Sequence, residues 1–522
     1  MSLISRLKKP GFRRTTETRT HAYEATSTAD RVSDWDQTPY GPNAALDFNQ
    51  IARARTQDAV RNNPWLRRAI KLLVSHLIGC GMQPRPQVAD PGLRRDLVTL
   101  FNDWSDEADA DGVLDFYGQQ ALMSRARYES GETFIRLRSR RPGDGLTVPL
   151  QVQILEADLL PLHHNQPERR IRQGIERNAL GQRVAYWFYR EHPGDRFFAD
   201  LSLTALSRVP AEDVLHHYRP DRPGQLRGAP EGISTLYRAR NIDQYESAEL
   251  TRKKNRSKFN GVIWKDNPED NPLTDAPANP VLTALQAELA TLEASAEYQA
   301  NDPTALASAD TLRAQILEEQ QRKTFIDVDD GYMLQLGLNE RIELSTGDTG
   351  NTDLLDFLRT QLRAIAAGWG VPYELLCGDY ADTNDRIMRV ILNVFYRELE
   401  QQQDQFAAQV LRPLWRRWLD DAWRVNAITL RDYNNNPRPY QRIEWRAHAW
   451  AYVNPLQEAQ TAVLKVKNGL SSRAAEVSAL GWDVEDVDRD NKNDQGREKK
   501  LGLVYGGQGA VDKPSTVDKP TP

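Results

Sequence analysis

The sequence predicts an α+β protein in which long helices flank a β-rich central region. Two observations carry this prediction. Before residue 130 and after residue 232, apolar residues recur at helical spacing over long segments. Between about residues 131 and 220, short alternating or β-rich segments are separated by turns. The chain has 522 residues, of which 39% are hydrophobic, and this suits roughly three or four domains with buried cores.

The composition argues against several classes of protein. The 68 basic and 73 acidic residues give a net charge of -5, which is unlike a polycation that coats nucleic acid. Cys80 and Cys377 are the only cysteines, so neither a disulfide framework nor a CxxC zinc site is expected. We therefore expect the protein to occur in a reducing compartment. The N-terminus lacks the apolar core of a secretory signal, and the run AIKLLVSHLIGCGM is too short to span a bilayer. We therefore expect a protein that works in water, away from membranes.

The first 130 residues predict a mobile arm followed by helices. Residues 1–50 are polar, with Pro39 and Pro42 near the end, and are expected to be extended or mobile. A helical pattern over Thr56–Ile78 is divided at Asn63-Pro64, where Asn63 is expected to cap a new helix. Two further helices are predicted, over Gly92–Ala108 and Leu114–Glu129.

The β-rich region precedes a long helix and a helical hairpin. Asn178–Gln182 (NALGQ) predicts a β-hairpin in which Gly181 takes a positive φ. A helix is expected from Ser234, its cap, to Gly261. Leucines at alternating spacings of three and four over Leu282–Leu292, with a second helix near Ala309–Lys323, predict a helical hairpin with a local seam. Short β segments follow in TFIDV, YMLQLGL and RIEL.

After residue 352 the sequence predicts a helix, a break and a second long helix. One apolar stripe of the first helix comprises Leu355, Leu358, Leu362, Ile365 and Trp369. The sequence Gly-Trp-Gly-Val-Pro then ends this helix and turns the chain into a polar loop. Asn384–Trp423 predicts a very long helix with a kink at Pro413. Two capped helices are expected near the end, at Asn454-Pro455 and at Ser471, before a disordered tail.

The sequence contains no recognisable catalytic constellation. Gly368-Trp369-Gly370 lacks a third glycine and follows a helix, so it indicates a helix end and not a dinucleotide site. GxxxxGK[ST], HExxH and GxSxG motifs do not occur. Neighbours on a strand point to opposite faces, so a metal site at His163-His164 or His216-His217 is disfavoured, and these histidines are expected at the surface or in turns. Asp329-Asp330 and Asp420-Asp421 are expected to be solvated. We expect no enzyme, no cofactor and no metal site.

One basic cluster allows two interpretations. It lies near the C-terminal end of its helix and comprises Arg252, Lys253, Lys254, Arg256 and Lys258. These charges either complement the helix dipole or contact phosphates or an acidic partner. The residues alone leave both interpretations open.

Several blocks of sequence are modest motifs individually, but their number and order together make a specific pattern. They are ARARTQDAVRNNPWLRRAIKLLVSHLIGCGMQPRP, LQVQILEADLL, IRQGIERNALGQRVAYWFYREHPGD, RPDRPGQLRGAPEGISTLYRARNIDQYESAELTRKK, LRAIAAGWGVPYELLCGDYADTN and YVNPLQEAQTAVLKVKNGLSS. Over roughly residues 50 to 490 the chain resembles the lambda-like family of bacteriophage portal proteins, which are head–tail connectors. The helical insert at Leu282–Lys323 departs from the family pattern.

The resemblance implies a ring, typically a dodecamer, at one capsid vertex of the virion, assembled in the host cytoplasm. Double-stranded DNA is packaged through its channel by the terminase large subunit and is later ejected. Major capsid and scaffolding proteins and head-completion or tail adaptor proteins are the other implied partners. The implied segments are a mobile arm (1–50), wing (51–232), stem helix (233–261), clip with helical insert (262–351), second stem helix (352–377), tunnel loop (378–386), long kinked helix returning to the wing (387–449), crown (450–500) and disordered tail (501–522).

The polar loop then resembles the tunnel loop that projects toward DNA. Its implied channel residues are Asp379, Tyr380, Asp382, Thr383, Asn384, Asp385 and Arg386. A mostly acidic or neutral lining would guide a sliding duplex without holding it, since lysines there would bind phosphates by counterion release. The alternative is a non-enzymatic nucleic-acid-binding module that uses the 252–258 basic cluster.

Overall fold

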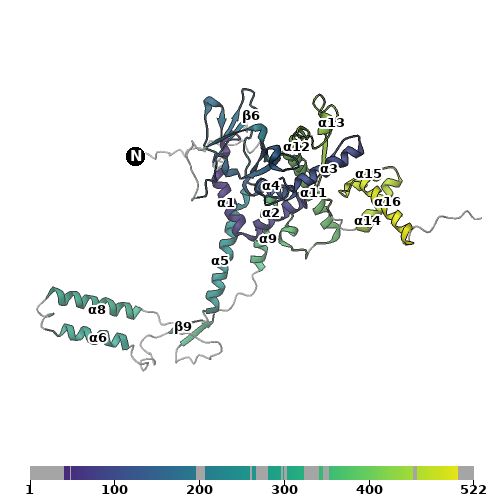
Figure 1. Ribbon diagram of the computed structural model, residues 1–522. Coiled ribbons are helices and arrows are strands. Elements are labelled where there is room, and N and C mark those ends of the chain that lie inside the picture. Colours follow the sequence, from purple (N-terminus) through teal and green to yellow (C-terminus); the bar gives the residue numbers. More distant parts are fainter. Residues whose placement is uncertain are drawn as a thin grey trace, which may run out of the picture. The chain divides into compact units, whose positions relative to one another are not determined.

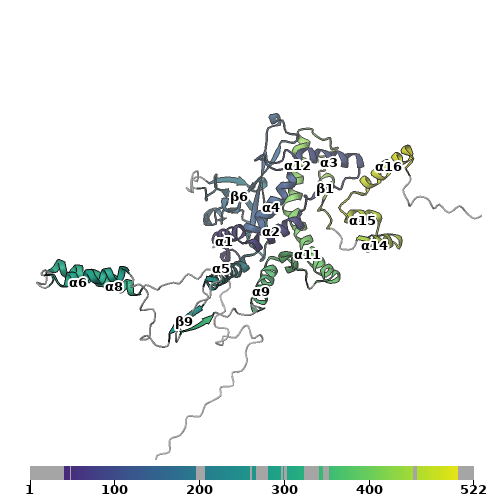
Figure 2. The same cartoon turned by 90° about the horizontal axis from the view of Figure 1, so that it is seen from below.

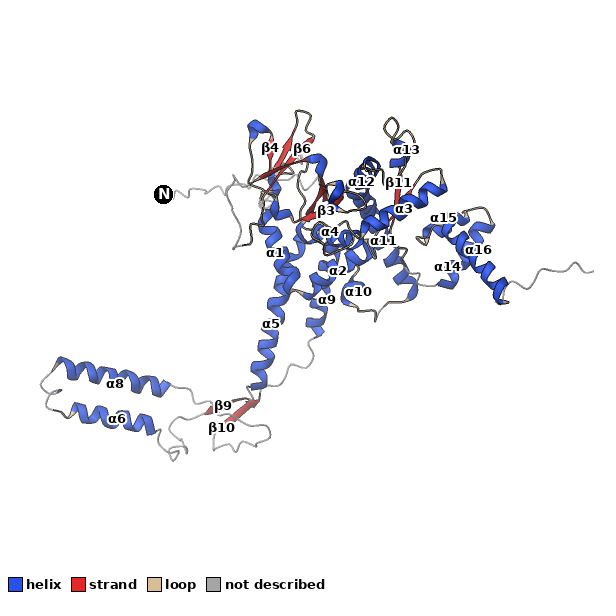
Figure 3. Cartoon of the chain, viewed as in Figure 1, coloured by secondary structure: helices blue, strands red, loops and turns tan. Residues whose placement is uncertain are grey.

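The computed structural model describes residues 40–47, 49–195, 206–258, 261–265, 280–295, 298, 302–321, 340–344, 352–381, 383–450 and 455–503. The chain divides into two compact units, one of Met1–Arg240 with Arg359–Pro522 and the other of Asn241–Leu358. Both helices and sheets are present, and the predicted α+β class is confirmed (Figures 1 and 3). Among the helices of the described ranges, none is both long and apolar enough to cross a membrane.

Four helices open the first unit. They are α1 (Asn49–Asn62), α2 (Pro64–Leu77), α3 (Pro91–Ser105) and α4 (Phe116–Ser130). The predicted cap at Asn63 is confirmed, because its side-chain oxygen accepts hydrogen bonds from the backbone N–H groups of Trp65 and Leu66. The expected mobile arm is anchored at its end: Asn43 is buried and bonds to Gly224 and Leu226, while residues 1–39 lie outside the described ranges.

The β-rich region consists of two antiparallel sheets. The first has the order β3 (Leu150–Leu155), β2 (Glu132–Ser139), β8 (Val214–Tyr218). The second has the order β4 (Ile171–Arg172), β5 (Ile175–Arg177), β6 (Arg183–Phe188), β7 (Ser207–Pro210). The predicted hairpin at Asn178–Gln182 is confirmed, because Gly181 has a φ of 81° and connects β5 to β6. In the first sheet, Phe134 on the central strand lies opposite Leu155 and His216.

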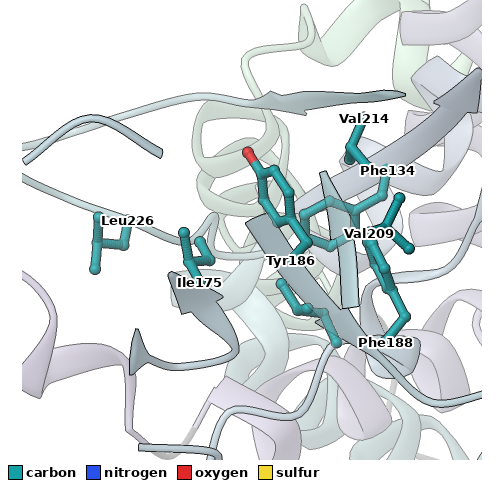
Figure 4. Close-up of a cluster of buried hydrophobic side chains, with 8 residues drawn as sticks. Phe134, Ile175, Tyr186, Phe188, Val209, Val214 and Leu226 are labelled. Atoms are coloured by element: carbon teal, nitrogen blue, oxygen red, sulfur yellow. The ribbon is translucent and has the colours of Figure 1, made fainter. Parts of the chain in front are cut away.

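Two buried clusters hold this unit together. Side chains from both sheets form the first cluster (Figure 4), which comprises Phe134, Leu160, Ile175, Tyr186, Phe188, Val209, Val214 and Leu226. Aromatic rings form the second, where Phe101 of α3 lies 5.1 Å from Trp418 and 5.7 Å from Trp445 between ring centroids. Trp445 belongs to β11 (Ile443–Arg446), which pairs with β1 (Gln83–Pro86), so residues 360 positions apart close one core.

The long helix predicted over Asn384–Trp423 is interrupted before Pro413. It consists of α11 (Asp385–Phe406), a π-helical turn (Ala407–Leu411) and α12 (Arg412–Arg424), with Pro413 in the first turn of α12. Proline has no N–H and its ring crowds the carbonyl four residues earlier, and a wider turn relieves both effects. The side-chain amide of Gln409, in that turn, accepts from the Tyr218 N–H and donates to the Tyr218 carbonyl.

A buried ion cluster joins α1, one end of the first sheet and the loop that follows β8. The Glu132 carboxylate accepts hydrogen bonds from Arg53, from Arg227 Nε at 2.7 Å, from His216 Nε2 at 2.9 Å and from the Gly228 N–H at 2.9 Å. Burial alone raises the pKa of Glu132, but Arg227 and Arg53 outweigh it and hold that pKa well below its ordinary value. The carboxylate is therefore ionised, and the cluster is compensated internally.

The expectation of surface or turn histidines is wrong for three of the four residues. His164, His216 and His217 are buried, and only His163 is exposed. The strand does send His216 and His217 to opposite faces, but both faces of β8 are covered: His217 Nδ1 bonds to Gln409 Oε1 at 2.8 Å. Burial lowers the pKa of His216 to about 4 and that of His217 to about 3.

These two histidines predict a loss of stability in mild acid. Between pH 6.5 and about 4 the unfolded chain binds their protons and the folded chain does not, so the free energy of unfolding falls as pH falls. The expected slope is about 1.4 kcal/mol per pH unit for each histidine. Urea unfolding at pH 7.5 and pH 5.0 measures it. His217→Gln should reduce the difference by about 2 kcal/mol, whereas His448→Gln, at an exposed position, is the matched control; equal differences in both variants contradict the prediction.

The expectation that Asp420-Asp421 is solvated is wrong for Asp421. Its side chain is buried and accepts hydrogen bonds from Arg417 Nε at 3.0 Å and Arg424 at 3.1 Å. Asp329-Asp330 lies outside the described residues. An acidic residue on a helix can thus pair with arginines one turn away and become buried, even where its neighbour in sequence is acidic.

The second unit contains the remainder of two helices, a two-stranded sheet and a helical hairpin. Helix α5 (Leu236–Lys258) follows a 3-10 turn that includes Ser234, so α5 starts two residues after the predicted cap and ends before Gly261. Strand β9 (Gly261–Lys265) pairs with β10 (Glu340–Leu344); the sequence predicted β10 and missed β9. TFIDV and YMLQLGL lie outside the described residues. Helix α9 (Thr352–Trp369) contacts α5 here through Tyr245 and Phe357, whose ring centroids are 5.3 Å apart.

The predicted helical hairpin is confirmed as α6 (Pro280–Glu293) and α8 (Pro303–Gln321). Ala309 is fully buried between the helices, and the leucines of α6 are half-buried. Arg313 closes the hairpin by donating to Glu293 at 2.8 Å and to the Tyr298 hydroxyl at 2.8 Å. The leucine seam is local, as the spacing predicted.

The C-terminal part of the first unit is helical. It begins after the short helices α10 (Tyr373–Cys377) and α13 (Arg438–Gln441) and comprises α14 (Pro455–Lys467), α15 (Arg473–Ala479) and α16 (Val484–Leu501), as Figure 2 also shows. The cap of α15 is Ser472 and not the expected Ser471, because the Ser472 hydroxyl accepts from the Ala475 N–H. The predicted disordered tail lies outside the described residues from 504 onward.

Candidate functional site

The break at Gly368-Trp369-Gly370 is the foundation of the polar loop. Trp369 is fully buried at the end of α9, and its indole Nε1 donates a hydrogen bond to Thr235 Oγ1 at 3.0 Å. The Thr235 hydroxyl in turn donates to the Gly232 carbonyl at 2.8 Å. The end of α9 is therefore fastened to the start of α5 inside the first unit.

Two glycines permit this contact. A Cβ at Gly232 would overlap the Trp369 indole, and a Cβ at Gly368 would overlap the Thr235 side chain. Gly370 has a φ of 65°, which favours glycine and turns the chain out of the helix. The interpretation of the motif as a helix end is confirmed, and its first glycine serves close packing as well.

Helix α10 carries the chain from the break to the loop. Leu376 is fully buried, and Arg68 of α2 donates from Nε to the Leu375 carbonyl at 3.0 Å. Gly378, with a φ of 69°, caps α10 by donating to the Glu374 carbonyl at 2.8 Å. Burial raises the pKa of the Cys377 thiol to about 11, so this cysteine is an unreactive packing residue.

The structure separates the predicted channel residues into two kinds. Asp379 and Asn384 stabilise the loop: Asp379 accepts from the Tyr373 hydroxyl at 3.2 Å and lies 3.5 Å from Arg359, and Asn384 caps α11. Tyr380, Asp385 and Arg386 are exposed, and Thr383 is half-buried with its N–H on the Tyr380 carbonyl. The side chain of Asp382 lies outside the description.

The loop is thus anchored at both ends and open in the middle. Gly378 caps the end of α10 and Asn384 caps the start of α11, so both ends of the loop between them are fixed by backbone hydrogen bonds. Asp385 lies in the first turn of α11, where a negative charge is favoured by the helix dipole. Function through exposed loop side chains on rigid supports is a common arrangement.

The basic cluster belongs to the other unit. Arg252, Lys253 and Lys254 are exposed on α5, and Arg252 donates to Glu249 at 2.9 Å. The side chains of Arg256 and Lys258 lie outside the description. Part of the positive charge of the cluster is therefore paired with Glu249, one turn earlier on the same helix, which favours the helix-stabilising interpretation for Arg252.

One group of potential metal ligands occurs among the described residues. Glu156, Asp158 and His192 each offer an atom within 4.8 Å of the others. His192 Nε2 already lies 3.0 Å from Glu156, and the Arg53 guanidinium lies 3.6 Å from Asp158. A cation would compete with that arginine, so the group is best described as a surface ion pair beside the buried cluster.

The sequence reading missed the ion cluster around Glu132. Its members come from residues 53, 132, 216 and 227, and no local spacing connects them. The available signal was an acidic residue directly after a glycine, at the start of a strand whose apolar residues alternate with arginines. Such a residue is rarely buried unless it is paired.

Comparison with known proteins identifies relatives across most of the chain. The family described as "Phage portal protein, lambda family" matches residues 28–403. A probable portal protein of Halomonas phage phiHAP-1 is 24% identical over 87% of this chain and 82% of the relative. Portal protein B of Escherichia phage lambda is 21% identical over 88% of this chain and 86% of its own length. A subunit from the neck of an empty gene transfer agent particle is similar with a TM-score of 0.47 and 14% identity, over 83% of this chain and 93% of that chain.

Proposed function

Because this chain belongs to the lambda family of phage portal proteins, we propose that it forms a ring whose channel admits double-stranded DNA at one vertex of the head. The protein is a portal protein and a component of the phage particle at that vertex. The channel serves packaging by the terminase and later ejection of the genome. Its role is structural, with no catalytic step of its own.

The observation that carries the proposal is the anchored polar loop. The matched region includes α5, α9 and the loop that follows α10, and this loop exposes Tyr380, Asp385 and Arg386. Gly378 and Asn384 hold its ends with bonds made inside the chain, so its middle is free to face a channel. Asp379 is partly neutralised by Arg359 at 3.5 Å, which leaves a weakly charged surface.

The segments of the family fold are assigned to this chain as part of the proposal. The helices and sheets of residues 51–232 form the wing, and α5 and α9 are the stem helices. The β9–β10 sheet and the α6–α8 hairpin lie in the clip, the loop at 378–386 is the tunnel loop, and the C-terminal helices form the crown. Head-completion or tail proteins, capsid and scaffolding proteins and the terminase large subunit are the proposed partners.

The native mass of the purified protein, with class-averaged electron micrographs, tests the ring. A closed ring with a central hole supports the proposal. A monomer that binds duplex DNA in low salt, and loses this binding in Arg252→Glu/Lys253→Glu, would instead favour the nucleic-acid-binding module. The two outcomes separate because a portal ring encloses DNA without strong phosphate contacts.

Reversal of the loop charge should slow packaging. In Asp382→Lys/Asp385→Lys, the added lysines would bind phosphates of the passing duplex, and packaging should slow by about tenfold, the factor that corresponds to about 1.4 kcal/mol of added binding. An in vitro packaging assay with assembled rings measures the rate. Asp490→Lys, on the exposed face of α16, is the matched control. Equal packaging rates in the wild-type protein, the loop variant and the control would contradict the proposed role of the loop.

A further inference from the structure

The C-terminal helices have an apolar surface that their own chain leaves uncovered. Across the described residues 455–503, no residue is buried. The large apolar side chains Leu456, Val463 and Leu470 are 69%, 66% and 80% exposed. Helices of 13 and 7 residues are marginal in water without packing, so this segment requires a covering surface.

The attachment of this segment to its own chain is polar. Arg85 of β1 lies 2.8 Å from Asp483 and donates to the Ser478 hydroxyl at 3.1 Å, and Arg94 of α3 lies 2.9 Å from Glu485. These side chains are partly exposed, and ion pairs of this kind contribute little to stability. They fix the position of the segment without covering its leucines and valines.

Helix α11 has an uncovered apolar stripe of its own. Phe395, Leu399 and Phe406 face the core. A second face, with Arg389 and Tyr396, lines an open cavity of about 580 Å3. A third face bears exposed aliphatic side chains: Ile387, Val390 and Val394 are 47%, 62% and 59% exposed, and the exposed Glu398 follows one turn later.

The two surfaces have the same spacing. On α11 the stripe occupies Ile387, Val390 and Val394, at i, i+3 and i+7. On α14 Leu456, Ala459 and Val463 repeat that spacing. Residues so spaced form one face of a helix and are typical of a helix–helix seam.

Within one chain these stripes face away from each other. Glu458 of α14 and Arg389 of α11 line the same cavity. With 3.6 residues per turn, each stripe lies roughly 130° around its helix from the residues on the cavity side. The α14 of a chain therefore borders its own α11 by other faces, and the described part of the chain leaves both stripes open to another molecule.

We propose that the α14 stripe of one subunit packs on the α11 stripe of a neighbouring copy. This contact rests on the proposed ring and specifies one of its interfaces. Because it joins two different surfaces, it is heterologous, and heterologous contacts are those that close rings. A like-with-like contact between α14 helices would pair copies two by two and leave the α11 stripe in water.

Crosslinking between mixed subunits tests the contact directly. Both subunits carry Cys80→Ser and Cys377→Ser; one adds Val390→Cys and the other adds Val463→Cys. Assembled together and treated with a short bis-maleimide, they should give a crosslinked dimer that neither subunit gives alone. An intramolecular link cannot produce this product, because each chain has one cysteine. A control mixture replaces Val463→Cys with Lys492→Cys on α16 and should give no dimer.

The outcomes separate this inference from the proposed function. Rings in electron micrographs without the crosslinked dimer overturn the α11–α14 contact and leave the ring standing. A dimer from Val463→Cys alone also overturns it, in favour of like-with-like packing. A crosslinked dimer in the mixture, with no rings in the electron micrographs, supports the α11–α14 contact and contradicts the proposed ring.

Substitution on the stripe gives an independent measurement. Val390→Asp/Val394→Asp should reduce the fraction of subunits in rings by about tenfold at fixed protein concentration, because carboxylates would be buried without partners. Asn393→Asp places one carboxylate on the cavity side of α11 and should assemble normally. Unchanged assembly of the stripe variant contradicts the contact, since both valines are exposed and their substitution leaves the core intact.

Discussion

Glu132→Ala should lower the free energy of unfolding by about 3–5 kcal/mol, the largest effect that we expect from a single side chain. The substitution removes the carboxylate that faces Arg53, Arg227 and His216, and the two buried guanidinium groups then share one remaining carboxylate, that of Asp158, which lies 3.6 Å from Arg53. Breaking one side of a buried ion cluster costs more than the cluster itself contributes, because the remaining charges stay out of water. Equilibrium unfolding in urea at pH 7.5 measures the loss.

Glu176→Ala is the matched control. Glu176 also pairs with an arginine, Arg208 at 2.9 Å, but the side chain of that arginine is 43% exposed, whereas those of Arg53 and Arg227 are buried. Solvent screens such a pair, so its loss should cost at most about 1 kcal/mol. Equal losses in the two variants would mean that burial does not decide the strength of the Glu132 cluster.

Gly232→Ala should lower the free energy of unfolding by about 1–3 kcal/mol. The added methyl group would overlap the Trp369 indole, which cannot move away easily because it is buried and bonded to Thr235. The end of α9 would shift, and α10 and the loop after Gly378 would shift with it. We therefore expect this variant to slow packaging even at temperatures where it remains folded.

Thermal unfolding and the packaging assay together test this expectation. Gly143→Ala is the control, because nothing lies within 4 Å of a Cβ at that glycine. Its stability should change by less than about 0.5 kcal/mol. A Gly232→Ala protein as stable as the control would show that the Trp369 contact is loose.

The local features of the fold were predictable because they depend on neighbours in sequence. Asn63 caps α2 and Gly181 turns the β-hairpin through bonds and dihedral angles within a few residues. The leucine spacing of α6 predicted its hairpin with α8 for the same reason. Strand β9 was missed because its partner β10 lies about eighty residues further along, and a single short apolar run does not reveal it.

The candidate site was predictable in place but not in detail. The Gly-Trp-Gly break and the polar loop are evident from the residues, whereas the capping role of Asn384 is known only from the structure. The pairing of Asp379 with Arg359 and Tyr373 is not evident from the residues either, because it depends on the return of the chain across the end of α9. The burial of His216 and His217 was missed because covering β8 on both faces needs the π-helical turn at Ala407–Leu411.

By itself, the sequence determined the family, the order of the long helices around the β-rich region, and the position of the exposed loop, because motifs, caps and periodicities are properties of short segments. Only the tertiary structure decided which charges are buried and which apolar stripes stay uncovered. Glu132 meets arginines from residues 53 and 227, and the stripes of α11 and α14 are left facing water by the way each helix is already packed. Burial is a property of the assembled chain, and long-range contacts are what assemble it.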